Sequence, residues 1–171
     1  ELLGSTYQVI EEGLCGRTTA FDDVTEPGRS GLDRIRDAVE KNELLDLLII
    51  MLGSNDCKAQ FQASAEEITK GLERLLEKAE DGKTSDFRIL LVAPAAMTEQ
   101  VMHSGFGSEF DRRSVEVSKE LAGTYEELAK KCGYDFLDGT KVTQVSGIDG
   151  LHLDADGHGR LAEAIGDWVK K

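Results

Sequence analysis

Uninterrupted apolar runs alternate with amphipathic stretches along this chain. Residues 47–52 are six consecutive apolar residues, a pattern typical of a strand covered on both faces within a parallel sheet. Residues 88–93 (RILLVA) are expected to form a second buried strand, in which five apolar residues follow Arg88 and Pro94 stops the run. Shorter strands are expected at residues 7–11 and 134–137. These runs predict a sheet whose central strands are buried.

Helical periodicity fills the intervals between these strands. Ser64 and Glu67 have the spacing of a capping box, and the apolar stripe that follows them ends at residues 81–83. The other expected helices lie at residues 32–39, at about 109–132 with Gly133 as the cap, and from Asp154 onward. Residues 1–4 resemble the end of a helix that is capped by Gly4.

Strands and helices alternate, which favours βαβ units and a parallel sheet. A chain of 171 residues is long enough to bury a core of its own. We therefore expect one α/β domain over residues 1–171.

Composition narrows the classes of partner and compartment. The formal charge of −13, from 20 basic and 33 acidic residues, disfavours nucleic acids and anionic membranes as partners. The chain has no apolar run of about 18 residues. Its cysteines, Cys15, Cys57 and Cys132, lack the spacing of a disulfide framework or zinc site, and so favour a reducing, cytoplasmic setting. No cofactor or metal is indicated.

The sequence has three polar loops, and each of them follows a predicted strand. They are residues 13–17, residues 53–56, and residues 149–152 before the last helix. In a parallel α/β sheet such loops converge beyond the carboxyl ends of the strands. Asp149 and His152, three residues apart, can place a carboxylate against the imidazole Nδ1 and leave Nε2 free as a general base. An isolated pair at this spacing is usually a capping interaction, but the two other polar loops favour chemistry.

The segments VIEEGLCGRTT, IIMLGSND and DGLHLDADGH resemble blocks II, III and V of the SGNH hydrolases, the GDSL-type esterases and acyltransferases, and are most similar to the arylesterase branch. The resemblance implies a three-layer α/β/α fold with a flavodoxin-like parallel sheet. It also implies acyl transfer through a serine ester, with a small-molecule ester as substrate and no cofactor.

The same resemblance implies roles for individual residues. His152 would be the general base and Asp149 its orienting partner. The backbone N–H of Gly16 and the side-chain amide of Asn55 would donate to the oxyanion, each worth on the order of 3 kcal/mol. Five further residues are candidates for the substrate pocket, with loop packing or ion pairing as the alternative: Arg17, Asp56, Met97, His103 and Phe106.

The nucleophile of the resembled family is not found in these residues. Its serine lies in a Gly-Asp-Ser motif after the first strand, and no such motif occurs here. Ser5, Ser54, Ser104 and Ser108 are not credible substitutes, and Cys15 is expected to be a small loop residue. We therefore expect an N-terminal βα unit to be missing, or its strand to come from another chain, since residues 7–11 and 47–52 would otherwise each keep an unpaired edge.

Two classes of function remain open at this point. The first is a serine esterase for small acyl esters, with acyl transfer to alcohols, carbohydrate O-deacetylation or thioester hydrolysis as variants. The second is a ligand-binding relative without catalysis, against which the retained Asp149 and His152 argue. A homo-oligomer is compatible with either class.

Overall fold

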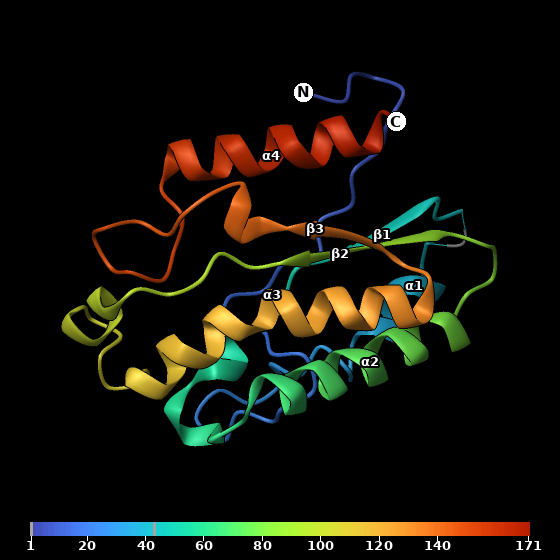
Figure 1. The fold of residues 1–171 in the computed structure, drawn as a ribbon. Coiled ribbons are helices and arrows are strands. Elements are labelled where there is room, and N and C mark those ends of the chain that lie inside the picture. The colour runs from blue at the N-terminus through green and yellow to red at the C-terminus, as the bar shows by residue number, and fades with distance from the viewer. Residues whose placement is uncertain (1, 43) are drawn as a thin grey trace.

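The computed structural model describes residues 2–42 and 44–171, and within them three parallel strands form a sheet in the order β1-β2-β3 (Figure 1). The strands are β1 (Leu47–Ile50), β2 (Arg88–Ala93) and β3 (Asp135–Asp138). The helices are α1 (Ile35–Glu40), α2 (Ala65–Asp81), α3 (Arg112–Cys132) and α4 (Ala155–Val169), with short 3-10 helices at Asn55–Cys57, Ala59–Phe61, Glu99–His103 and Gly139–Lys141.

Helices cover both faces of the central strand β2, as the five consecutive apolar residues after Arg88 predict. Ile89, Leu91 and Ala93 belong to the main core, which they share with α1, α2 and α3. Leu90 and Val92 face the other way and pack with Leu161 of α4. Figure 1 shows α4 on one side of the sheet and the other three helices on the opposite side. The predicted three-layer α/β/α fold is confirmed.

Local capping explains where the two long helices begin. Ser64 and Glu67 form the predicted capping box of α2. At α3, the Asp111 carboxylate accepts from the Ser114 N–H, and the Ser114 hydroxyl accepts from the Asp111 N–H. Gly133, at φ +74°, ends α3 in the left-handed conformation, as predicted. The boundary predicted at residue 109 is three residues early because Asp111 is the cap.

The strand predicted at residues 7–11 is not formed. Tyr7, Val9 and Ile10 are among the exposed large apolar residues, and the segment has no regular secondary structure. Alternating apolar residues become a strand only with a hydrogen-bonding neighbour, which this segment lacks among the described residues. The helix end predicted at residues 1–4 is likewise not helical at Leu2 and Leu3, which form a turn, whereas Glu1 lies outside the described residues.

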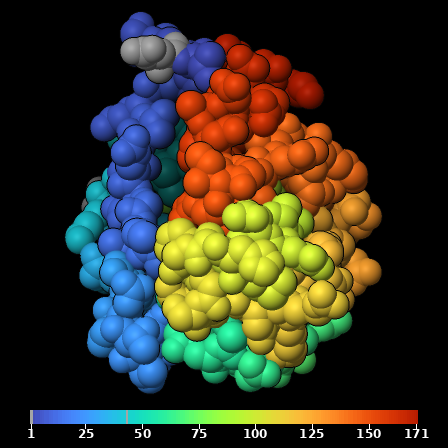
Figure 2. Space-filling model, turned by 90° about the vertical axis from the view of Figure 1, so that its left-hand side faces the viewer, coloured from blue at the N-terminus to red at the C-terminus, as the bar shows by residue number. Residues whose placement is uncertain are grey.

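Strand β1 lies at the edge of the sheet, so it has the unpaired edge that was expected for residues 47–52 when no further strand is present. The expected cover of both its faces is incomplete, as its exposed residues show. The strand pairs with β2, and its Ile49 side chain is 39% exposed. A groove of about 1280 Å³ lies between β1 and the N-terminal segment from Thr6 to Leu14. In Figure 2 this groove is the recess beside the N-terminal segment, which is drawn in blue.

None of the helices within residues 2–42 and 44–171 combines the length and the apolar character that crossing a membrane requires.

The turn after β1 generates a prediction about stability. Gly53 has φ +121°, and a Cβ there would collide with the hydroxyl of buried Tyr125. We expect Gly53→Ala to lower the free energy of unfolding by about 2 kcal/mol or more. Chemical denaturation measures this change.

Gly123→Ala is the matched control. Gly123 lies inside α3, and a Cβ there would meet no atom within 4 Å. Alanine should therefore stabilise the protein by about 0.5–1 kcal/mol. Equal effects of the two substitutions would contradict a specific strain at Gly53.

Candidate functional site

The loop between β3 and α4 places the Asp149 carboxylate against the His152 imidazole. Asp149 Oδ2 lies 2.8 Å from His152 Nδ1, and Oδ1 accepts from the N–H groups of Leu151 and His152, each at 2.9 Å. Partial burial opposes ionisation of Asp149, but these N–H groups and the imidazole outweigh it and lower the pKa of the carboxyl. The geometry predicted from the spacing of the two residues is therefore present.

This arrangement determines which imidazole nitrogen is available. A carboxylate held at Nδ1 favours the tautomer with a proton there, so Nε2 is the nitrogen that can accept one. The His152 side chain is 55% exposed and can meet a substrate. Its ring lies 5.1 Å from that of Phe106, centroid to centroid, and the rings are tilted by 58°.

Phe106 belongs to the segment that follows β2, and this segment is tied to the histidine loop. Thr98 N–H donates to the Gly150 carbonyl at 3.0 Å, and Gln100 Nε2 donates to the Ile148 carbonyl at 3.4 Å. Of the predicted pocket residues, Phe106 is thus the one placed directly against the candidate base.

The other two polar loops meet each other. Asn55 Nδ2 donates to the Arg17 carbonyl at 3.1 Å. The Arg17 N–H donates to the Leu14 carbonyl at 3.1 Å, which closes a turn in which Gly16 has φ +76°. Because the Arg17 carbonyl accepts a hydrogen bond, it fixes the orientation of the Asn55 amide. The two candidate oxyanion donors, Gly16 and Asn55, therefore lie on loops in direct contact.

Asp56 does not fit its prediction as a pocket residue. It is fully buried, and its two oxygens accept from the Thr19 N–H at 2.9 and 3.1 Å and from the Thr19 hydroxyl at 2.5 Å. Burial raises its pKa to about 6, although the hydrogen bonds from Thr19 favour the charged form. The carboxylate faces the interior because its partner, Thr19, lies there.

Met97 does not fit a pocket role either, since it is 2% exposed and belongs to the main core. His103 is exposed at the end of a short 3-10 helix. Arg17 lines the groove beside β1, and its Nε has no hydrogen-bond partner among the described residues. The alternative that Arg17 pairs with Asp22 or Asp23 is not realised among the described residues, and Asp23 binds Lys58 instead.

Lys58 is a buried residue that the sequence reasoning missed. Its side chain is 4% exposed, and Nζ lies 3.0 Å from Asp23, 2.8 Å from Glu109 and 3.6 Å from Glu26. Desolvation opposes the charge, but these carboxylates raise the pKa of Lys58. No periodicity marks this residue, since its partners come from distant segments.

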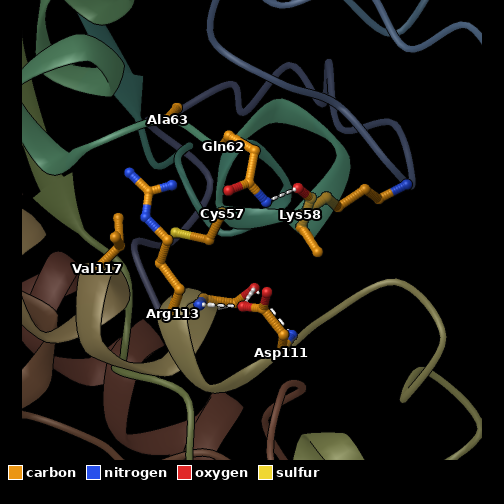
Figure 3. A pocket seen from close by; sticks show the side chains of 9 residues that line it. Cys57, Lys58, Gln62, Ala63, Asp111, Arg113 and Val117 are labelled. Carbon is orange, nitrogen blue, oxygen red and sulfur yellow. Dashed lines mark hydrogen bonds between the residues drawn. The ribbon is translucent and has the colours of Figure 1, made fainter.

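A cavity of about 10 Å³ lies beside Cys57 and Lys58, and it has room for about one water molecule. Figure 3 shows the Cys57 side chain directed toward Arg113 and Val117, whereas Lys58 extends away toward the N-terminal loop. Burial raises the pKa of the Cys57 thiol to about 12, with the charge of Asp56 adding to the effect. Cys57 is therefore a packing residue and not a nucleophile.

The two groups of candidate residues lie at the same edge of the sheet. Asn55 follows β1, Phe106 follows β2, and the Asp149–His152 turn follows β3. Because the three strands are parallel, all these segments leave the sheet at its carboxyl edge. Figure 1 shows the segments after β2 and β3 together at the left of the molecule.

Comparison with known proteins identifies the family and the fold of this chain. The model of the GDSL-like Lipase/Acylhydrolase family matches residues 1–160. A carbohydrate acetylesterase from Sinorhizobium meliloti is 34% identical, with a TM-score of 0.90 over 99% of this chain and 80% of that chain. An aryl esterase from M. smegmatis, solved with an inhibitor bound, is 31% identical, with the same TM-score and the same coverage.

A putative arylesterase from Agrobacterium tumefaciens is 33% identical, with a TM-score of 0.82 over 99% of this chain and 82% of that chain. The search of curated proteins finds no match. The match to the family model over nearly the whole chain, together with these neighbours, shows that the chain belongs to the GDSL-like lipase/acylhydrolase family, as its three sequence blocks predicted.

Proposed function

We propose that this protein hydrolyses small acyl esters through an acyl-serine intermediate. In this proposal His152 is the general base and Asp149 orients it. The observation that carries the proposal is the 2.8 Å contact between Asp149 Oδ2 and His152 Nδ1, which leaves Nε2 free on an exposed ring. Family membership and the esterase neighbours support ester hydrolysis as the reaction class.

In the proposed reaction, His152 Nε2 takes the proton of a serine hydroxyl while the serine oxygen attacks the ester carbonyl carbon. The carbonyl oxygen of the ester becomes an oxyanion, and the imidazolium that forms is stabilised by Asp149. His152 then gives the proton to the departing alcohol. Water, deprotonated by the same nitrogen, releases the acid and restores the serine.

Gly16 and Asn55 are the proposed oxyanion donors. One N–H of the Asn55 amide is used by the Arg17 carbonyl, at 3.1 Å, and the amide nitrogen has a second hydrogen to donate. A donor that is already held in place needs no reorganisation when negative charge develops, which is the source of its catalytic value.

We further propose that the nucleophilic serine directly follows a strand, outside residues 1–171, that pairs with the open edge of β1. The groove of about 1280 Å³ beside β1 is lined on one side by β1 and on the other by exposed apolar residues such as Tyr7, Val9 and Ile10. A strand in this groove would satisfy the backbone groups of β1 and cover these side chains.

Carbohydrate O-deacetylation is the second candidate. It is favoured by one observation, the 34% identity to the carbohydrate acetylesterase from Sinorhizobium meliloti. Parallel assays with acetylated sugars and with p-nitrophenyl acetate separate it from a general arylesterase activity. Acyl transfer to alcohols, which uses the same acyl-serine, would appear as alkyl ester product when alcohol is added.

Labelling with a fluorophosphonate tests the proposed serine. We expect the active protein to be labelled at one serine outside residues 1–171, and peptide mapping by mass spectrometry identifies that residue. Residues 1–171 alone should remain unlabelled. Labelling of Ser54 or Ser104 would overturn this part of the proposal.

Replacing the candidate base tests its role. We expect His152→Ala to abolish turnover of p-nitrophenyl acetate by the active protein while its thermal midpoint stays nearly unchanged, because the side chain is half exposed. His158→Ala, which removes an exposed histidine at the start of α4, is the control and should keep full activity. Unaltered turnover by His152→Ala would remove His152 from the mechanism.

Removing the candidate amide donor should act on the chemical step. We expect Asn55→Ala to lower kcat by on the order of 10²–10³-fold, as for the loss of one oxyanion donor. Steady-state kinetics separates kcat from KM. A rise in KM alone would instead make Asn55 a residue that binds the ground state.

A further inference from the structure

We propose that Asp56 is a positioning residue, whose buried carboxylate clamps Thr19 and so holds the Gly16–Arg17 backbone against Asn55. The inference rests on the proposed function, because it concerns the spacing of the two oxyanion donors. Asp56 itself touches no substrate, since it is fully buried.

The clamp fixes Thr19 through both of its donors. The Asp56 carboxylate accepts from the Thr19 N–H and from the Thr19 hydroxyl, across 37 residues of sequence. The Thr19 carbonyl accepts in turn from the Leu32 N–H at 2.9 Å. Thr19 is therefore held on its N–H, its carbonyl and its side chain, so the backbone leading into it from Gly16 has one fixed end.

Thr19 packs closely against two glycines, Gly31 and Gly71. A Cβ at Gly71 of α2 would lie 2.6 Å from the Thr19 hydroxyl oxygen, and a Cβ at Gly31 would lie 3.2 Å from the Thr19 carbonyl oxygen. Only glycine at these two positions lets the Thr19 segment lie this close. The clamp thus works within a rigid site.

Three residues of the turn after β1 contact three residues of the N-terminal loop, in the same order along the sequence. Asn55 donates to the Arg17 carbonyl, Asp56 accepts from Thr19, and Lys58 binds Asp23. Three residues of one turn thereby hold three successive points of one loop. Asp56 is the central contact, and it lies next in sequence to the donor Asn55.

The chemistry of this position is unusual for a residue that only packs. Burial raises the pKa of Asp56, and the titratable side chains that face it are Cys57 and Tyr125, neither of which is cationic. A buried carboxylate without a cation weakens the folded state. Retaining one here is understandable if a charged acceptor is needed to hold Thr19, since Oδ1 accepts from both the N–H and the hydroxyl of Thr19 and Oδ2 accepts from the N–H as well.

Asp56→Asn tests the clamp, with Thr19→Val as a second variant should the first fail to fold. In the active protein we expect each to lower kcat for p-nitrophenyl acetate by about 10–100-fold and to change KM by less than about twofold, because the misplaced donors act on the transition state. Thr19→Ser, which keeps both donors, should retain kcat within about threefold.

Stability gives a readout that separates positioning from general support of the fold. The raised pKa means that the stability contributed by Asp56 is lost as pH rises from its unfolded value toward about 6. Replacing the charge by a neutral amide should therefore leave the thermal midpoint at neutral pH unchanged or higher, even though kcat falls. A loss of kcat that simply follows a lowered midpoint would overturn the proposal.

A double-mutant cycle and hydrogen exchange complete the test. If Asp56 acts through the oxyanion donors, Asp56→Asn should cost much less in the Asn55→Ala background than alone, and fully multiplicative losses would overturn the proposal. Independently of activity, Asp56→Asn should speed amide exchange in the peptide covering residues 14–21, and unchanged exchange would also overturn it. An inactive wild-type protein would contradict the proposed function. Hydrogen exchange alone would then test whether Asp56 holds the Thr19 segment.

Discussion

The parallel pairing of β1, β2 and β3 is the constraint on which the site depends. It sends three distant segments out of the sheet at one edge, and each brings a different polar group with it. The central strand β2 is buried on both faces, so the edge is anchored in the most rigid part of the core. The sheet thus brings the loops close together, and hydrogen bonds within and between the loops fix their final positions.

Those loop contacts are dominated by charged groups removed from water. Asp23, Asp56 and Lys58 are all nearly inaccessible, and each would be costly without its partners. Asp23 and Lys58 pair directly, so that the pKa of Asp23 lies well below its usual range despite burial, with Thr25 and Lys58 outweighing that desolvation. Asp56 instead relies on neutral donors. The site region thus holds its geometry through polar contacts where apolar packing would be the more stabilising choice.

The sequence was informative wherever the deciding contacts are local. The bounds of β2 were predicted correctly because its five apolar residues and the proline that follows them are contiguous in the sequence, and the capping box at Ser64 lies within four residues. The contact between Asp149 and His152 was predictable for the same reason, since three residues separate them.

The errors arose where a distant partner decides the outcome. Asp56 looked like a pocket residue because a polar side chain after a strand can face solvent or interior, and the choice is made by Thr19, far away in the chain. Lys58 gave no signal because its burial depends on Asp23 and Glu109. The apolar residues within 7–11 favoured a strand but could not reveal whether a pairing partner is present.

The open edge of β1 also has a consequence for how this protein behaves at high concentration. An edge strand with exposed Ile49, followed by exposed Met51, offers unpaired backbone groups and apolar side chains to any extended chain. None of the usual protective devices, such as proline or lysine within the strand, occurs in Leu47–Ile50. Whenever the groove beside β1 is empty, self-association should begin there, so occupancy of this groove would govern the solubility of the protein.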